Sequence, residues 1–329
     1  MSLPLTAEPC LVADVGGTHA RFGLVSEGRP DPYDVRVLRC ADYPDLVSAV
    51  ENYLHRTDRV RPVAACVAVA GPVLGDRVRL TNTGWDFSVI DSRRRLRLRH
   101  LEVINDFTAL ALAVPHLPRE AFVGIGTGIR RHREPIAVIG PGTGLGVAAL
   151  VRSAQTWIPI SGEGGHAGLP VETAREAEIA AVLRQRHEVV CAETVLSGPG
   201  LIRLYQAVAL LHGVPATCTH PEQIHLAARR FDDPVAHETL EVFFGLFGAF
   251  CGNVALTFGA RGGVLLGGGV LLDMADLLAG SDFRRRFVGN RSVTGYLDDV
   301  ATEVITAYVP ALRGAACLLT QNDPALETA

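Results

Sequence analysis

Apolar residues near the start of the chain form short runs that turn-forming residues separate. Residues 10–25, CLVADVGGTHARFGLV, contain an apolar run, two glycines and a threonine, and then a second apolar run. The residues after Thr18 lack helical spacing, so the pattern predicts two strands joined by a tight turn. Dinucleotide-binding and Walker-type loops lead from a strand into a helix, so this turn belongs to neither class.

Helices and strands alternate over the next hundred residues. The pattern predicts helices over 44–54 and 107–115 and buried strands over 63–70 and 97–104. Asn105 and Asp106 end the second of these strands, which puts Asp106 at or near a strand-to-helix junction. The charged segment 130–134 marks a loop.

The strand–turn–strand pattern returns at residues 136–151, IAVIGPGTGLGVAALV, again with glycines and a threonine in the turn. This repetition suggests two duplicated α/β domains that face one another. We expect a small domain at residues 1–114 plus about 307–329, and a large domain at residues 115–306.

Helical spacing dominates most of the second half. Thr173 and Glu176 form a possible capping box, and Asp233-Pro234 is a favoured helix start. The pattern predicts helices over 175–187, 201–212, 233–258 and 308–319 and strands over 262–270 and from 304. Three glycines of the third helix would let neighbours approach closely: Gly245, Gly248 and Gly252.

Composition limits the classes of partner. The 329 residues are 48% hydrophobic and carry a net charge of −4, which argues against disorder and against a general nucleic-acid surface. No basic region with an apolar stretch opens the chain, and no apolar run approaches about 18 residues. We therefore expect a soluble cytoplasmic protein that binds a small molecule and neither nucleic acid nor a membrane. The seven cysteines lack any CxxC pair, so we expect neither disulfides nor a zinc knuckle.

All 31 basic residues counted as lysine or arginine are arginine. A Walker A loop needs its lysine on the phosphates, a protein kinase needs a strand lysine, and Schiff-base chemistry needs an amine. The absence of lysine excludes these three mechanisms.

Three glycine-rich turns at strand ends are candidates for phosphate binding. Glycines leave backbone N–H groups unobstructed, and a threonine adds a hydroxyl. Asp14, just before the first turn, could orient water on a magnesium ion that bridges the phosphates. A single such turn is more often a simple hairpin turn, but three are what a split nucleotide site needs. The turns lie at residues 16–18, 142–144 and 267–269.

Asp106 is the candidate general base. A kinase that acts on an alcohol needs a carboxylate to orient the hydroxyl and take its proton, and a helix N-terminus keeps such a carboxylate ionised. The alternative is a helix-capping role, and Asn105 shares this ambiguity.

Polar side chains in a second loop are suited to vicinal sugar hydroxyls. Glu163 and His166 lie in SGEGGHAG, where a carboxylate and an imidazole offer acceptors and a donor. A metal role for His166 has less support, because no cysteine or histidine cluster accompanies it. Glu193, before another Gly-Pro turn, fits either a sugar ligand or a first-turn helix acid.

Together these segments resemble the bacterial glucokinases of the hexokinase–actin–Hsp70 superfamily, and most closely the proteobacterial type. The resemblance runs in order through DVGGTHARFGLV, TNTGWDFS, LEVINDFTALALAVP, GPGTGLGVAALV, GEGGH, ETVLSGPGL and GGVLLGGGV. It implies two ribonuclease-H-like, actin-like ATPase α/β domains with mixed sheets, helices and an interdomain cleft. It also implies magnesium-dependent transfer of the γ-phosphoryl group of ATP to the 6-hydroxyl of glucose, the first step of glycolysis.

The resemblance also implies roles for individual residues. Asp106 would be the base, and the sugar would be held by Asn105, Asp106, Glu163, His166 and Glu193. The nucleotide would be bound by Ala13, Asp14, Val15, Gly16, Gly17, Thr18, Gly142, Thr143, Gly144, Gly267, Gly268 and Gly269.

Three places depart from the family pattern. Ala13 stands where many relatives carry glycine, His19 replaces a frequent asparagine, and AGLP at residues 167–170 replaces a more acidic or aromatic loop. The first two should alter affinity more than chemistry, and the third bears on hexose preference. The zinc-binding cysteines and DNA-binding segment of the related repressor–kinase family are missing. A non-catalytic sugar sensor and a phosphohydrolase of the same superfamily are the alternatives, and a homodimer is possible.

Overall fold

The computed structural model describes residues 9–26, 29–57, 60–80, 82–230, 233–289, 293 and 295–321. Its contacts divide the chain into two units, which are residues 1–117, 154–161 and 307–329, and residues 118–153 and 162–306. Our domain prediction placed residues 154–161 in the large domain, whereas these contacts assign them to the first unit. The Ser161 hydroxyl lies 2.7 Å from the Thr108 hydroxyl within that unit. The predicted ends at 1–8 and 322–329 lie outside the described residues.

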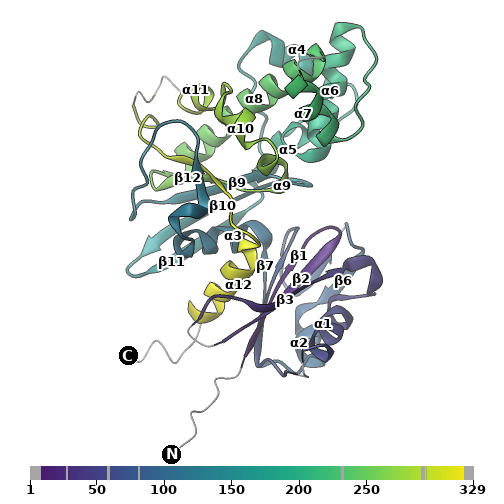
Figure 1. Cartoon of the computed structure of the whole chain (residues 1–329), viewed down its shortest axis with the longest axis vertical. Coiled ribbons are helices and arrows are strands. Elements are labelled where there is room, and N and C mark those ends of the chain that lie inside the picture. Colours follow the sequence, from purple (N-terminus) through teal and green to yellow (C-terminus); the bar gives the residue numbers. More distant parts are fainter. Residues whose placement is uncertain are drawn as a thin grey trace, which may run out of the picture. The chain divides into compact units, whose positions relative to one another are not determined.

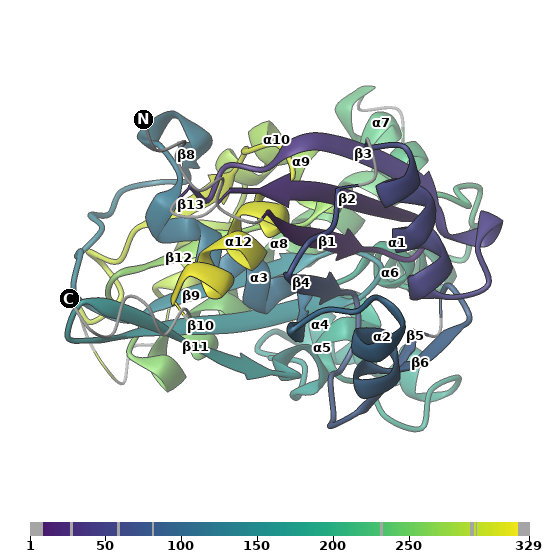
Figure 2. The same ribbon diagram turned by 90° about the horizontal axis from the view of Figure 1, so that it is seen from below.

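The first unit is built on a five-stranded sheet with the order β3-β2-β1-β4-β7. Figure 2 shows β3, β2, β1 and β4 side by side. β1 and β2 are antiparallel, as predicted, while β1, β4 and β7 run parallel. A separate hairpin, β5-β6, completes the strands. Their bounds are β1 (Cys10–Val15), β2 (His19–Val25), β3 (Tyr33–Arg39), β4 (Ala64–Val69), β5 (Arg77–Leu80), β6 (Trp85–Ser88) and β7 (His100–Asn105).

Helices cover both faces of this sheet. Alternate residues of β1 point to opposite faces, and both sets contain apolar residues, so each face needs a covering layer. Leu11, Ala13 and Val15 pack in one cluster with α1, whereas Val12 packs with α12. The helices of the unit are α1 (Leu46–His55), α2 (Val89–Arg95), α3 (Asp106–Ala113) and α12 (Pro310–Gln321). Gly314 of α12 lies so close to α3 that a Cβ there would overlap the carbonyl oxygen of Ala109.

The second unit repeats this topology. Its sheet has the order β11-β10-β9-β12-β13-β8, and strands β9 to β13 are arranged like the five strands of the first sheet. β11 belongs to this sheet by its pairing with β10, although the contacts assign its residues 156–161 to the first unit. β9 and β10 are antiparallel, whereas β12 runs parallel to both β9 and β13. The strands are β8 (Phe122–Gly124), β9 (Ile136–Pro141), β10 (Leu145–Ser153), β11 (Thr156–Gly162), β12 (Gly263–Leu266) and β13 (Thr302–Ile305). Each unit therefore has the mixed α/β sheet predicted from the sequence.

A group of helices extends from the second sheet (Figure 1). They are α4 (Ala174–Arg184), α5 (Ala192–Val195), α6 (Gly198–His212), α7 (Pro221–Arg230), α8 (Pro234–Phe258), α9 (Gly269–Leu272), α10 (Ala275–Ala279) and α11 (Phe283–Phe287). The predicted close approach to α8 is confirmed at Gly248 and Gly252, where a Cβ would overlap the carbonyl oxygens of Phe283 and Phe287. Gly245 faces only the end of the Arg286 side chain, at 3.4 Å.

Local signals placed several helix ends correctly. Thr173 and Glu176 form the predicted capping box, and the Asp233 side chain accepts hydrogen bonds from the amides of Val235 and Ala236. The predicted strand over 97–104 was wrong at its start. Arg97 has φ of 56° after α2, and the strand begins at His100.

α8 is the one helix of the described residues that is long and apolar enough to cross a membrane, by length and composition. However, 78% of its most apolar 18-residue window is buried inside the protein, as in a core helix.

Candidate active site

Strand register brings the first glycine turn and the candidate base to one edge of the first sheet. Val15 pairs with Val69 on β4, and Val69 pairs with Asn105 on β7. These three strands are parallel, so their carboxyl ends meet at that edge. Two strand spacings, about 10 Å in all, separate the end of β1 from the end of β7.

The first turn offers fewer backbone donors than the sequence suggested. The Gly16 amide donates to the His19 carbonyl oxygen at 3.0 Å, so Gly17 and Thr18 remain the candidate donors of the turn. Gly17 lies against Asn82, whose Cβ would be 3.1 Å from a Cβ at position 17. Asn82 belongs to TNTGWDFS and is a site neighbour that our residue-by-residue reasoning did not single out.

Asp14 differs from the other β1 residues proposed for the nucleotide. Ala13 and Val15 point into the core and are at most 1% exposed, whereas the Asp14 side chain is 16% exposed and 3.3 Å from Arg21 Nη1. Burial raises the pKa of Asp14 above its ordinary value, and the positive charge and hydrogen bond of Arg21 offset this only in part.

A bound cation would stabilise the buried Asp14 carboxylate, so this position fits magnesium. Magnesium keeps several waters and takes only one or two protein carboxylates plus substrate phosphates. Within the described residues, no group of three or more histidine, cysteine, aspartate or glutamate side chains could hold a metal ion.

Asn105, and not Asp106, caps α3. The Asn105 side-chain oxygen accepts from the amides of Phe107 at 2.9 Å and Thr108 at 3.3 Å, and its nitrogen donates to the Gly71 carbonyl oxygen. Asp106 is the first helical residue, and its Oδ1 accepts from the Phe107 amide at 2.9 Å. The N-terminal dipole of α3 favours an ionised carboxylate there. The capping role thus belongs to Asn105, while Asp106 keeps the position expected of a base.

In the second unit, Glu193 reaches the second glycine turn. The Leu145 amide, directly after Gly144, donates to Glu193 Oε2 at 2.7 Å. A Cβ on Gly144 would overlap that same oxygen. Glu193 lies in the first turn of α5, so it is both a first-turn acid and a neighbour of the turn.

The loop with Glu163 and His166 packs against the same turn. Gly165 is buried, and a Cβ there would overlap the Leu145 carbonyl oxygen. Glu163 and His166 are exposed, with Oε2 and Nε2 separated by 3.9 Å. The Ala192 amide donates to the Ala167 carbonyl oxygen at 2.8 Å, which ties this loop to the start of α5. Glu163, His166 and Glu193 therefore all lie on segments that surround the second turn.

The third glycine cluster lies at the same edge of the second sheet. β12 ends at Leu266, and not in the glycines as predicted, because Gly268 adopts φ of 91° and precedes α9. The Gly267 amide donates to the Ile139 carbonyl oxygen at 2.9 Å, and a Cβ on Gly268 would overlap the Pro141 carbonyl oxygen. Gly267–Gly269 thus directly adjoin the strand that leads into Gly142–Gly144.

Cys191 is a neighbour of the sugar residues that our sequence reasoning missed. Its Sγ lies 4.0 Å from His166 Nδ1 and 3.3 Å from Thr194 Oγ1. Burial alone would raise the pKa of Cys191, but hydrogen bonds from Thr194 and His166 bring it below its ordinary value. The Cys191 contact raises the pKa of His166 in return. The sequence feature that could have identified Cys191 is its position two residues before Glu193.

Comparisons with known proteins identify the family of the chain. The family model described as Glucokinase matches residues 11–322. A glucokinase of Paramagnetospirillum magneticum is 46% identical over 94% of this chain and 97% of its own length, and one of Aromatoleum aromaticum is 45% identical over 94% of both. The crystal structure of a glucokinase from an Antarctic psychrotroph, 39% identical, superposes with a TM-score of 0.86 over 96% of this chain and 99% of that chain. The chain therefore belongs to the glucokinase family.

Proposed function

We propose that the chain transfers the γ-phosphoryl group of ATP to the 6-hydroxyl of D-glucose, with Asp106 as the general base. The proposal is carried by the position of Asp106, which Asn105 places at the sheet edge of the first glycine turn in a chain that matches glucokinases over nearly its full length. Neither a sugar sensor nor a phosphohydrolase has support from these relatives.

Asp106 would orient the 6-hydroxyl and accept its proton as the hydroxyl oxygen attacks the γ-phosphorus. The bond between the γ-phosphorus and its bridging oxygen then breaks, and ADP leaves. Asn105, Glu163, His166 and Glu193 would bind the other sugar hydroxyls and thereby fix the orientation of the 6-hydroxyl.

The glycine turns would stabilise the phosphates. The turn at Gly17 and Thr18 would supply amides and a hydroxyl, and Gly142–Gly144 and, toward the adenosine, Gly267–Gly269 would supply further amides. Asp14 would hold magnesium through water, and the metal would neutralise charge on the phosphates. A homodimer and a cytoplasmic location remain predictions.

The test is a coupled ADP-release assay with and without glucose, on the wild type and on Asp106→Asn. We expect glucose-dependent ADP release and a fall in kcat of about 10²–10⁴-fold in the variant, the usual size for loss of a positioned proton acceptor. Asp91→Asn is the matched control, because Asp91 is also a first-turn acid, on α2. We expect it to keep kcat.

Two results would contradict the proposal at different levels. A wild type that releases ADP equally well without glucose would exclude the sugar kinase activity. A wild type with glucose-dependent turnover whose Asp106→Asn variant keeps most of its kcat would exclude only the assignment of the base.

A further inference from the structure

Glu193, one of the proposed sugar ligands, also forms a hydrogen bond with the backbone at the end of the glycine turn Gly142–Gly144. Its Oε2 accepts a hydrogen bond of 2.7 Å from the Leu145 amide, between two segments that lie 48 residues apart in the chain. A carboxylate has two oxygens and about four lone-pair sites, so this bond leaves capacity for a sugar hydroxyl. One side chain can therefore contact the sugar and the backbone that follows Gly144.

Leu145 is held from two directions. Its amide donates to Glu193, and its carbonyl oxygen is covered by Gly165 of the loop that carries Glu163 and His166. The Gly198 amide also donates to the Gly142 carbonyl oxygen at 2.8 Å, from the start of the helix that follows Glu193. Both sugar-side segments thus contact the backbone of the phosphate turn directly.

We propose that Glu193 is a positioning residue that couples the binding of glucose to the geometry of the turn Gly142–Gly144. This inference rests on the proposed function, in which Glu193 is a sugar ligand. A sugar hydroxyl that donates to the carboxylate restricts its rotamers, and this holds the Leu145 amide and the turn in one arrangement. Coupling between binding sites is reciprocal, so nucleotide phosphates on the turn must favour sugar binding by the same factor.

Two alanine substitutions in the same turn separate this coupling from a local effect on phosphates. A Cβ at Gly144 would overlap Glu193 Oε2 and displace the carboxylate, whereas a Cβ at Gly142 would meet nothing within 4 Å. Neither glycine has φ in the left-handed region, so the backbone at both positions accepts alanine. Gly142→Ala is therefore the matched control for Gly144→Ala.

The first measurement is the Kd of glucose by calorimetry without nucleotide, with thermal unfolding to check that both variants fold. Gly144 lies in the nucleotide turn, but its substitution displaces the Glu193 carboxylate. We therefore expect Gly144→Ala to raise the Kd of glucose by about tenfold, which is within the usual range of coupling factors. We expect Gly142→Ala to leave the Kd of glucose within about twofold of the wild-type value, because its Cβ does not displace Glu193. Equal glucose affinities in the two folded variants would overturn the inference.

The second measurement uses the sugar side and covers the case in which Gly144→Ala does not fold. Glu193→Asp withdraws the carboxylate from Leu145, so we expect it to raise the KM of ATP as well as that of glucose. Glu163→Asp is the control, since Glu163 is an exposed sugar-side carboxylate whose Oε2 lies 3.9 Å from His166 Nε2. We expect it to raise the KM of glucose alone. An ATP KM that Glu193→Asp leaves unchanged would overturn the inference.

Failure of the inference and failure of the proposed function give different results. Wild-type protein that binds glucose but shows no glucose-dependent ADP release overturns the proposed function. If the wild type is active but Gly144→Ala leaves the glucose affinity unchanged, only the coupling is overturned.

Discussion

At the scale of single residues, burial dominates the electrostatics of Asp14, and its ion pair with Arg21 compensates only in part. Its carboxylate is mostly buried, and Arg21 at 3.3 Å is itself 36% exposed, so solvent screens the attraction. Burial therefore dominates and raises the pKa of Asp14. A carboxyl group with a raised pKa weakens the folded state once it ionises, so the cation of the substrate complex would relieve that cost.

Asp14→Asn should therefore affect stability and activity in opposite directions. Without ligands at pH 7 we expect an unfolding temperature equal to or above that of the wild type. The difference should develop as pH rises past the ordinary value of 3.8 and be complete above the raised pKa. The magnesium concentration for half-maximal activity should rise roughly 10–100-fold, as for other residues that hold a metal indirectly. Scanning calorimetry at pH 4 and 7 and a magnesium titration check this, and a lower unfolding temperature at pH 7 would contradict it.

The roles of Asn105 and Asp106 show how far a residue pair can be interpreted from sequence. The strand-to-helix junction was predicted because an apolar run ends where a second one with helical character begins. Either residue could have capped the helix, since both side chains accept hydrogen bonds from amides. The structure shows that Asn105 is the cap, because its Oδ1 accepts from the amides of Phe107 and Thr108. Its Nδ2 also donates to the carbonyl oxygen of Gly71, two residues after β4.

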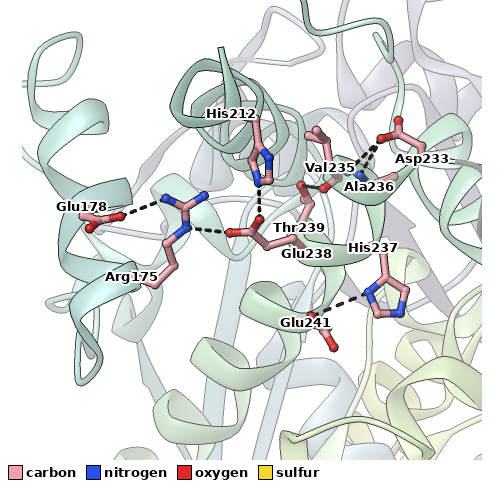
Figure 3. A network of polar contacts seen from close by, with 10 residues as sticks. All are labelled: Arg175, Glu178, His212, Asp233, Val235, Ala236, His237, Glu238, Thr239 and Glu241. Carbon is pink, nitrogen blue, oxygen red and sulfur yellow. Dashed lines mark hydrogen bonds and ion pairs between the residues drawn. The ribbon is translucent and has the colours of Figure 1, made fainter. Parts of the chain in front are cut away.

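At the scale of elements, one carboxylate connects three helices of the second unit (Figure 3). Glu238 of α8 accepts from Arg175 Nε of α4 at 2.6 Å, and its other oxygen lies 2.5 Å from His212 Nε2 at the end of α6. Burial alone would raise the pKa of Glu238, but hydrogen bonds from Arg175 and His212 bring it below the ordinary value. The sequence predicted each of these helices, but it did not predict the contacts between them.

We predict that Glu238→Gln lowers the free energy of unfolding by about 1 kcal/mol at pH 7, since the three side chains are 23–38% exposed and partly screened. A lowered carboxyl pKa stabilises the fold above its ordinary value of 4.5, and this contribution is lost as pH falls through the folded-state pKa. The difference from the wild type should therefore shrink below pH 4.5.

Urea unfolding at pH 7 and at acidic pH measures that difference. Glu241→Gln, one turn along α8, is the control, because Glu241 is 67% exposed and lies 3.6 Å from His237 (Figure 3). It should change stability by only a few tenths of a kcal/mol. A Glu238→Gln effect as large at low pH as at pH 7 would contradict the electrostatic explanation.

Local patterns predicted some elements and missed others for identifiable reasons. The two strand–turn–strand units were predicted correctly because their glycine turns separate continuous apolar runs. Among the elements that were missed are β3, the β5-β6 hairpin, α2, β11 and α7. The β11 sequence, TWIPISG, has consecutive apolar residues in place of an apolar–polar alternation, and it contains a proline, which argues against a strand.

At the scale of the whole molecule, α12 packs against the sheet that the first strands of the chain form. Leu312, Ala315 and Ala316 of α12 are buried against Val12 of β1. The approach of α12 to α3 depends on Gly314, which faces the carbonyl oxygen of Ala109. The helix that carries Asp106 is thus positioned by a segment about two hundred residues later in the chain.

Gly314→Ala tests this packing. In an exposed helix the change would stabilise by about 1 kcal/mol through helix propensity. Here the added Cβ would overlap a backbone atom, so α12 must move and we expect a net loss of about 2–3 kcal/mol, typical of overpacking. Gly124→Ala is the control, because nothing lies within 4 Å of its Cβ position. Denaturant unfolding measures both, and a Gly314→Ala variant as stable as the wild type would contradict this account.

The sequence by itself determined the glycine turns, the helix caps at Thr173 and Asp233, and the family, because each of these depends on residues that are neighbours in the chain or on motifs in order. Tertiary structure alone decided the register that aligns Val15, Val69 and Asn105, and the bond from Leu145 to Glu193. These contacts join segments tens of residues apart. Their formation depends on the packing of whole strands and helices, which no local pattern of residues specifies.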